Sequence, residues 1–200
     1  GDRFKVDVYG RTLETPFGVA AGPHTQMAQN IVVSWLMGAR LIELKTIQTL
    51  DELEIAKPCI DVEDEGYNVE WSQELKVFES FDEYLRAWVL VHALHAKLGF
   101  PGDAPGVLFN MSVGYDLAGI KQPNVQWSLD TMRDASAYLP AYVDVVAGRY
   151  PEVRDLDIPA CVSDTMTLST MHGCPPEEIE QISLYLLQAR KLHTSVNCNP

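Results

Sequence analysis

The stretch Thr15–Thr46, TPFGVAAGPHTQMAQNIVVSWLMGARLIELKT, decides the fold. Its first part is a short apolar run at 17–21, which a Gly-Pro pair ends, and this pattern predicts a buried strand followed by a loop. Residues 26–37 are typical of a helix that stops at the next glycine, and the apolar run at 40–45 predicts a second strand. A strand, a helix and a strand in this order predict a parallel βαβ unit.

The same alternation continues through the rest of the chain. Residues 5–13 precede the βαβ unit, and their alternating pattern around Tyr9-Gly10 predicts a small hairpin. After the unit, the apolar runs that predict strands lie at 106–113, 164–169 and 194–198, and the patterns that predict helices lie at 80–98, 125–149 and 175–191. Ser80 and Glu83 have the spacing of a capping box that opens the first of these helices, and Pro140 is expected to interrupt the second.

Strands that are almost continuously apolar, with helices between them, predict an α/β fold in which a parallel sheet is covered by helices. This pattern fits either a doubly wound sheet or a (β/α)8 barrel. A complete barrel needs eight strands and about 250 residues. We count five strands after the hairpin, so on the barrel interpretation residues 1–200 form one partial barrel domain whose last three strands are missing.

Composition excludes several classes of partner. The chain has 15 Lys and Arg against 28 Asp and Glu, a net charge of −13, which disfavours binding to nucleic acid or to an anionic membrane. No apolar run approaches the roughly 18 residues of a membrane span, and the first residues lack the apolar segment of a secretion signal. The four cysteines form no C-x-x-C pair, so we expect no metal site, reduced thiols and a cytoplasmic location.

Candidate functional residues cluster where predicted strands end, which is where parallel α/β proteins build their sites. Ala20, Ala21 and Gly22 follow the first strand, and such small residues allow a flat ligand to lie against the backbone. Lys45 and Thr46 end the second strand. There the lysine could place a positive charge beside an electron-rich cofactor, form a Schiff base, or simply be a surface or ion-paired lysine.

Further candidates lie downstream. Asn110 lies on the third strand, and Asn68 lies in the irregular stretch before it. Both carry amides that could hydrogen-bond to a planar ligand. The fourth strand carries Thr167 and leads to Cys174, which stands just before a Pro-Pro-Glu-Glu helix start. The helix dipole lowers the pKa of such a thiol whereas the two glutamates raise it, so the sequence leaves its reactivity open.

In this order, these residues resemble the FMN-binding dihydroorotate and dihydropyrimidine dehydrogenase family. The likeness begins at the hairpin and Thr15–Gly22, which is similar to the family's first barrel strand and flavin-contacting loop. It continues with Gly38–Thr46, similar to the strand whose lysine and Thr/Ser pair touch the flavin, and with Lys57–Asn68, similar to a segment that ends in a substrate-contacting asparagine. More closely, the whole chain is similar to the N-terminal region of selenate reductase-type subunits of the YgfK group, most clearly at Leu168–Ile179.

The sequence departs from the family pattern at three points. The family's fourth strand ends in Asn-Leu-Ser-Cys, with the cysteine as base, whereas this chain has Thr167 to Thr170 there and its Cys174 four residues later. Asn197 stands where the family's fifth strand presents a flavin-contacting lysine. The family's flavin phosphate site uses the last strands, which residues 1–200 do not include.

The resemblance implies a flavin-dependent oxidoreductase that transfers hydride between FMN and a small planar substrate. Ala20, Ala21, Gly22, Lys45, Thr46, Asn110 and Asn197 would contact the cofactor, Asn68 and Thr167 the substrate, and Cys174 would be the acid/base. NAD(P)H, FAD and 4Fe–4S clusters would belong to other domains of a longer parent, which would also supply the remaining barrel strands. Two alternatives stay open: a non-flavin lyase or aldolase that uses Lys45, and a non-catalytic scaffold.

Overall fold

A computed structural model describes residues 2–47, 75–102, 104–169 and 175–197. A two-stranded antiparallel hairpin comes first, and its strands are β1 (Val6–Val8) and β2 (Arg11–Leu13). Tyr9 and Gly10 both have positive φ, which is the backbone of the tight turn that joins hairpin strands. The structure therefore confirms the predicted hairpin and its turn.

The main sheet has five parallel strands, and they lie side by side in chain order. The strands are β3 (Gly18–Val19), β4 (Leu41–Glu43), β5 (Leu108–Val113), β6 (Thr165–Ser169) and β7 (His193–Asn197). A doubly wound sheet reverses its strand order at a switch point, whereas a barrel adds each strand next to the one before. The unbroken order fits the first five strands of a barrel and not a doubly wound sheet.

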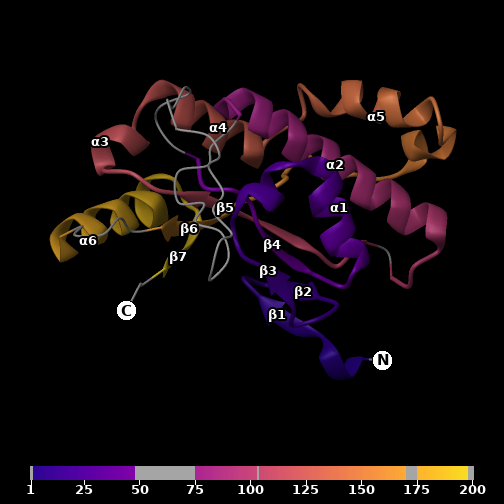
Figure 1. The fold of residues 1–200 in the computed structure, drawn as a ribbon, viewed down its shortest axis with the longest axis horizontal. Helices are drawn as coiled ribbons and strands as arrows, with labels where there is room; N and C mark the ends of the chain where they lie inside the picture. Colours follow the sequence, from indigo (N-terminus) through magenta and orange to yellow (C-terminus); the bar gives the residue numbers. More distant parts are fainter. Residues whose placement is uncertain (1, 48–74, 103, 170–174, 198–200) are drawn as a thin grey trace, which may run out of the picture.

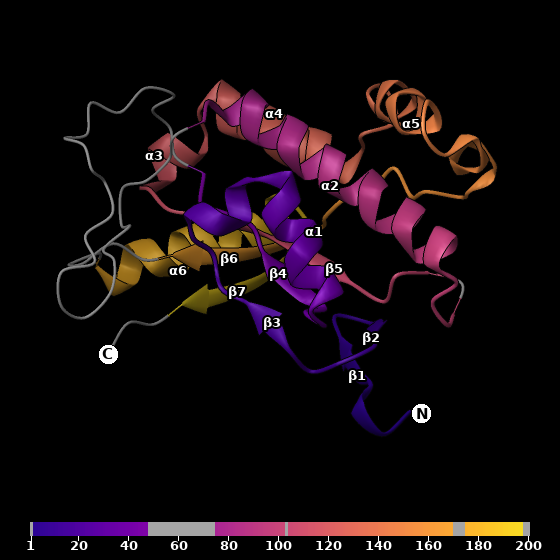
Figure 2. The same cartoon turned by 45° about the vertical axis from the view of Figure 1, so that its right-hand side comes forward.

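Helices cover one face of this sheet (Figure 1), and the view in Figure 2 shows the same one-sided arrangement. The helices are α1 (Ala28–Leu36), α2 (Val77–Leu98), α3 (Leu117–Ile120), α4 (Pro123–Arg133), α5 (Leu139–Ala147) and α6 (Pro176–Leu184). Shorter 3₁₀ turns occur at Asp2–Phe4, Pro23–Gln26 and Pro151–Asp155, and a π-helical turn at Tyr185–Ala189 extends α6. Trp35, Phe81 and Phe109 are fully buried between the helices and the sheet, in the core.

The two faces of the sheet differ in chemistry because side chains alternate along a strand. On β5, Phe109 and Met111 belong to the apolar core under the helices. Asn110 and Ser112 alternate with them and face the opposite side, where a barrel has its interior. All four residues are buried, so the sheet has an apolar outer face and a polar inner face.

The hairpin packs against the N-terminal ends of the strands. The ring of Tyr9 stacks on His193 at the start of β7 with 5.1 Å between centroids, and the guanidinium of Arg11 donates to Asp164 just before β6 at 2.6 Å. Nearer the middle of the sheet, the amide of Glu14 donates to the carbonyl of Gly106. The hairpin precedes β3 at one edge of the sheet and contacts β7 at the other edge. The sheet is therefore curved, as the wall of a barrel is.

The start of α2 differs from the prediction. α2 begins at Val77, and Ser80 lies inside it; the Glu79 carboxylate accepts from the Lys76 amide at the helix start. Glu83 instead accepts from the amide of Ala28 and so caps α1. The predicted capping box was therefore wrong, because a neighbouring helix uses the carboxylate.

The other predictions concern where elements break and end. The interruption predicted near Pro140 in the helix at 125–149 is confirmed: α4 and α5 are separated by residues 134–138, and Pro140 occupies the first turn of α5, where proline is tolerated. β3 and β4 are shorter than predicted and end at Val19 and Glu43. Ala20, Ala21 and Lys45 therefore follow their strands rather than lie within them.

Candidate functional site

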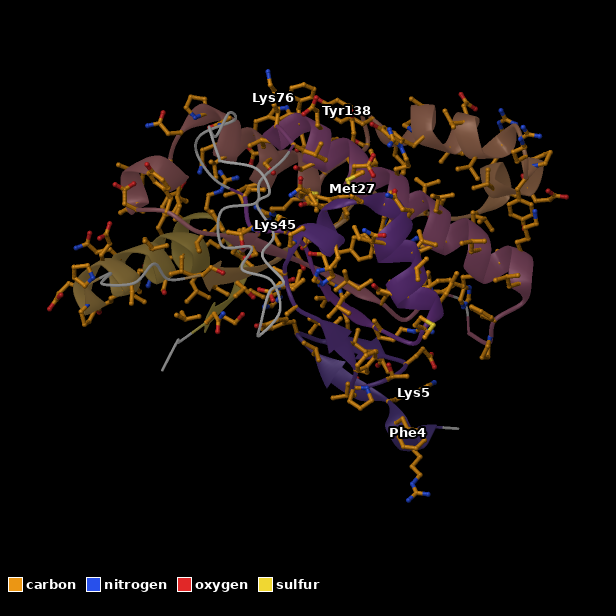
Figure 3. All side chains as sticks on the ribbon, viewed as in Figure 1. Phe4, Lys5, Met27, Lys45, Lys76 and Tyr138 are labelled. Atoms are coloured by element: carbon orange, nitrogen blue, oxygen red, sulfur yellow. The ribbon has the colours of Figure 1, made fainter. Side chains whose placement is uncertain are left out.

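Among the described residues, the predicted site residues lie on the inner face of the strands or just after the strands, toward the end of the sheet opposite the hairpin. Figure 3 shows Lys45 far from Phe4 and Lys5, which lie beside the hairpin. A site at this end has the inner face of the sheet below it and the loops that follow the strands around it. This is the end at which barrel enzymes hold their ligands.

The loop after β3 is fixed by hydrogen bonds from within the chain. The amide of Ala21 donates to the Glu43 carboxylate at 3.2 Å, and the amide of Gly22 donates to the Thr25 hydroxyl at 3.1 Å. Ala20 is exposed, Ala21 is half-buried and Gly22 is buried. The loop can offer a flat ligand its small side chains, whereas these two backbone amides already have partners.

Lys45 is joined to this loop through its backbone. Its amide donates to the carbonyl of Thr25 at 3.5 Å, and its own carbonyl accepts from the buried hydroxyl of Tyr84. These contacts place the residue after β4 beside the turn that follows Gly22. The predicted small residues and Lys45, which follow the first two strands, therefore lie close together at the C-terminal edge of the sheet. We call this edge the rim.

Lys45 is buried, and none of the described residues provides a counter-charge for it. Only 6% of the residue is exposed, and burial lowers the pKa of its ammonium group. Within the described part of the chain, no ion pair or hydrogen bond involves this ammonium. The surface-lysine interpretation is therefore wrong. An uncompensated buried cation has a free-energy cost that an electron-rich ligand would offset.

A first row of polar side chains crosses the inner face of three strands. The Asn110 amide donates to the Thr167 hydroxyl at 2.7 Å, and the Thr167 hydroxyl in turn hydrogen-bonds the Ser195 hydroxyl at 3.1 Å. We call Asn110, Thr167 and Ser195 the lower polar row. Barrel interiors are usually filled by branched apolar residues, so this row marks the inner face as a place for polar contacts.

A second row lies two residues further along the strands. The hydroxyls of Thr46 and Ser112 lie 2.9 Å apart, and those of Ser112 and Ser169 lie 3.3 Å apart. We call Thr46, Ser112 and Ser169 the upper polar row. Gly114 lies beside this row, where an added Cβ would come within 3.2 Å of the Thr46 methyl group. Asn197 pairs in register with Ser169, which places the end of β7 next to this row.

One buried acceptor in the lower polar row lacks a partner. The carbonyl oxygen Oδ1 of Asn110 has no hydrogen bond, although the residue is only 5% exposed. Leaving a buried acceptor unpaired costs about 1–3 kcal/mol. A ligand N–H at this point would remove that cost, and the pyrimidine ring of a flavin carries such a group. Asn110 and Lys45 thus fit a flavin by their chemistry.

Sequence reasoning missed part of this arrangement. Glu43, Ser169 and Ser195 were not among the predicted site residues. Their signal was their spacing, because Ser169 and Ser195 each stand two positions from a predicted site residue on the same strand and so share its face, and Glu43 stands two positions before Lys45. Asn68 and Cys174 lie outside the described residues, and their predicted roles stay predictions.

The described residues contain neither a metal-binding cluster nor a helix that could span a membrane. No three or more His, Cys, Asp or Glu side chains in these segments are grouped so that they could hold a metal ion. Likewise, none of the helices seen in the structure combines the length and apolar character that crossing a bilayer requires.

Comparison with known proteins gives consistent results. The family described as "Oxidoreductase YgfK, N-terminal TIM-barrel domain" matches residues 1–200. Two curated relatives, both named "Putative oxidoreductase YgfK", come from Escherichia coli strain K12 and from Escherichia coli O157:H7. Each is 48% identical to the chain over 215 residues, a match that covers 98% of this chain and 21% of the relative.

The chain therefore spans about a fifth of the length of these relatives. The family's description agrees with the parallel strand order seen in the sheet and confirms the expected barrel fold and YgfK-type resemblance. With its fold, its matched residues and its relatives in agreement, this chain belongs to the family of N-terminal TIM-barrel domains of YgfK oxidoreductases.

Proposed function

We propose that the complete protein is a flavin-dependent oxidoreductase and that this domain provides much of its FMN site. The observation that carries the proposal is that Lys45, which is buried and has no counter-charge among the described residues, is joined through its backbone to the turn after the small residues at 20–22. When bound, FMN would supply the ring that exchanges hydride with a small planar substrate. The protein's part is to bind and orient that ring.

Each described residue has a role that follows from its chemistry. Lys45 would complement the electron-rich edge of the ring, and Thr46 would offer a hydroxyl beside it. Asn110 would accept a ring N–H at its unpaired oxygen. Ala20, Ala21 and Gly22 would pack along the ring, because their small side chains allow close approach.

The roles at the edge of the site complete the proposal. Thr167 would contact the substrate from the lower polar row, and Asn197 would replace a charged flavin contact with a neutral one. Cys174 would be the acid/base and Asn68 a substrate contact. In a selenate reductase-type assembly, electrons would come from NAD(P)H through FAD and 4Fe–4S clusters in the rest of the protein, which would also complete the barrel.

The visible absorption spectrum of the full-length protein tests the proposal. We expect flavin bands in the purified protein and their bleaching when NAD(P)H is added. Acid extraction should release FMN in proportion to the protein. A colourless protein that takes up no FMN on reconstitution would exclude the proposed cofactor.

One observation also favours a second candidate, a lyase or aldolase that forms a Schiff base at Lys45. Burial lowers the pKa of this lysine, and a lowered pKa makes the amine a better nucleophile. Borohydride treatment in the presence of small carbonyl compounds distinguishes the two. A stable adduct at Lys45 would support the lyase, and its absence together with bound FMN would support the oxidoreductase.

A further inference from the structure

Glu43 is the last residue of β4 and has no role in the proposed function so far. Its neighbour Ile42 is fully buried in the core under the helices, so alternation puts Glu43 on the inner face of the sheet. There it pairs in register with Asn110 of the lower polar row. The other described inner-face positions on β5, β6 and β7 carry no carboxylate. A half-buried acid at this position is therefore an unusual feature of this wall.

The carboxylate holds the loop that follows the neighbouring strand. Its Oε2 atom accepts from the amide of Ala21 at 3.2 Å, so a side chain of β4 fixes the backbone after β3. The same loop is tied to β4 a second time, where the amide of Lys45 donates to the carbonyl of Thr25. Both connections lie at the part of the rim that the proposed flavin would occupy.

Glu43 and Lys45 stand two residues apart and carry opposite charges, yet they do not neutralise each other. No ion pair joins these two described side chains, and burial alone lowers the pKa of the lysine. The carboxylate is directed to a backbone amide instead. The carboxylate thus lies on the inner face of the sheet, where a negative charge would act on any nearby group that gains electrons.

We propose that Glu43 is a positioning residue of the flavin site: its carboxylate anchors the Ala20–Gly22 loop to β4 and places a negative charge on the inner face of the sheet. This inference rests on the proposed function. The first effect fixes the surface against which the ring packs. The negative charge of Glu43 disfavours the electron-rich reduced flavin and so lowers the reduction potential of the flavin. The positive charge of Lys45 would raise that potential.

Two substitutions separate these effects in the full-length protein. Glu43→Gln keeps an oxygen that can accept from the Ala21 amide but removes the charge, whereas Glu43→Ala removes both. Glu152→Gln is the matched control, because Glu152 is exposed on the turn after α5 and the substitution removes the same charge away from the site. Amide hydrogen exchange of the segment that contains Ala21 reports anchoring without flavin, and FMN affinity and reduction potential report the site.

We expect Glu43→Ala to speed exchange at Ala21 and weaken FMN binding, each by about tenfold, as loss of a hydrogen bond to a charged group predicts. Glu43→Gln should stay within about threefold of wild type in both but raise the reduction potential. Glu152→Gln should change none of the three. Unchanged exchange at Ala21 in Glu43→Ala would overturn the anchoring role, and an unchanged potential in Glu43→Gln would overturn the electrostatic role.

The two proposals fail in different ways. If the wild-type protein binds no FMN, the proposed function is lost, while exchange at Ala21 still decides whether Glu43 anchors the loop. If FMN is bound and neither variant differs from wild type, the flavin site stands and the role of Glu43 is excluded.

Discussion

The guanidinium of Arg11 donates to the carboxylate of Asp164 at 2.6 Å, and the two residues are 153 positions apart in the chain. Arg11 begins the second strand of the hairpin, and Asp164 comes directly before β6. The contact therefore fastens the hairpin to a strand that is neither its neighbour in sequence nor paired with it in a sheet.

This pair predicts a pH-dependent contribution to stability. Burial raises the pKa of Asp164, but the hydrogen bond and charge of Arg11 outweigh burial and hold that pKa below its usual value. Because the folded-state pKa is lowered, the contribution is fully present above the unfolded-state pKa of about 3.9 and is lost as the pH falls through the folded-state value. Arg11→Met should therefore reduce the free energy of unfolding by about 1 kcal/mol at pH 7, and by less as the pH is lowered.

Denaturant unfolding at a series of pH values measures this difference. Arg154→Met is the control, because Arg154 pairs with Asp144 where both side chains are more than half exposed. Its effect should be near zero. A loss for Arg11→Met that does not vary with pH would mean that packing, and not the ion pair, carries the contribution.

Glu83 predicts a coupling between two helices. Its carboxylate lies on α2 but accepts from the amide of Ala28 at the start of α1 at 2.7 Å, and it also pairs with Arg86. Glu83→Ala should lower the free energy of unfolding by about 1–3 kcal/mol, because it leaves a buried amide unpaired. Glu83→Gln should lose less, and Glu180→Ala, on the exposed face of α6, should lose almost nothing. Equal losses for Glu83→Ala and Glu180→Ala in urea unfolding would contradict the cap.

Substitution of two glycines, Gly18 in β3 and Gly22 in the loop after it, should have different effects on thermal stability. A Cβ on Gly18 would lie 2.5 Å from the backbone oxygen of Leu41, and this oxygen can move only if β3 and β4 separate. A Cβ on Gly22 would meet the imidazole of His24, which is exposed and can rotate away. Gly18→Ala should therefore lower the unfolding midpoint by several degrees, as a loss of about 1–3 kcal/mol implies, and Gly22→Ala should change it little. Thermal unfolding followed by circular dichroism compares them, and a reversed order would refute the close approach of the two strands.

Lys45→Met should have opposite effects on stability and on cofactor retention. In flavin-free protein it should raise the free energy of unfolding, because it removes a buried charge without a partner. Because burial lowers the folded-state pKa of this lysine, the wild type should gain stability as the pH rises through that value, and the variant should not. With FMN present, the variant should retain less cofactor.

Unfolding of the flavin-free protein and FMN stoichiometry after gel filtration measure the two effects. Lys97→Met is the control, because Lys97 lies on the exposed end of α2. Unchanged FMN stoichiometry in Lys45→Met would remove the lysine from the site. A loss of stability in flavin-free protein would show that the ammonium has a stabilising partner.

The hairpin and the succession of strands and helices along the chain could be predicted because local patterns determine them, whereas the side-by-side order of strands in the sheet could not, because a doubly wound sheet and a barrel share the same local patterns. Tyr9-Gly10 requires a tight turn, and apolar runs that alternate with helices require a parallel sheet. The start of α2 could not be predicted from Ser80 and Glu83, because Glu83 has a second possible partner at Ala28 that only the fold brings near. A local sequence rule assigns a side chain one hydrogen-bond partner, whereas the tertiary contacts of the fold decide which partner the side chain has.

The candidate site shows the same limit. Lys45 and the loop at 20–22 could be predicted because each follows an apolar run, and all residues after such runs in a parallel sheet reach one rim. The polar rows could not be predicted, because they depend on the register of the strands. Thr167 contacts Asn110 and Ser195 only when β5, β6 and β7 are aligned. The end of β4 at Glu43 also depends on a neighbour, since its carboxylate is turned to the Ala21 amide.

The stacking of Tyr9 on His193 has a consequence for the order in which the molecule assembles. The hairpin is made before the strands of the main sheet, and the ring that it packs against belongs to a strand that is made 184 positions later. Until then β1 and β2 lack this contact, and a two-stranded hairpin alone is marginally stable. Docking of the hairpin therefore depends on contacts of high sequence separation, which are slow to form because a long loop must close first.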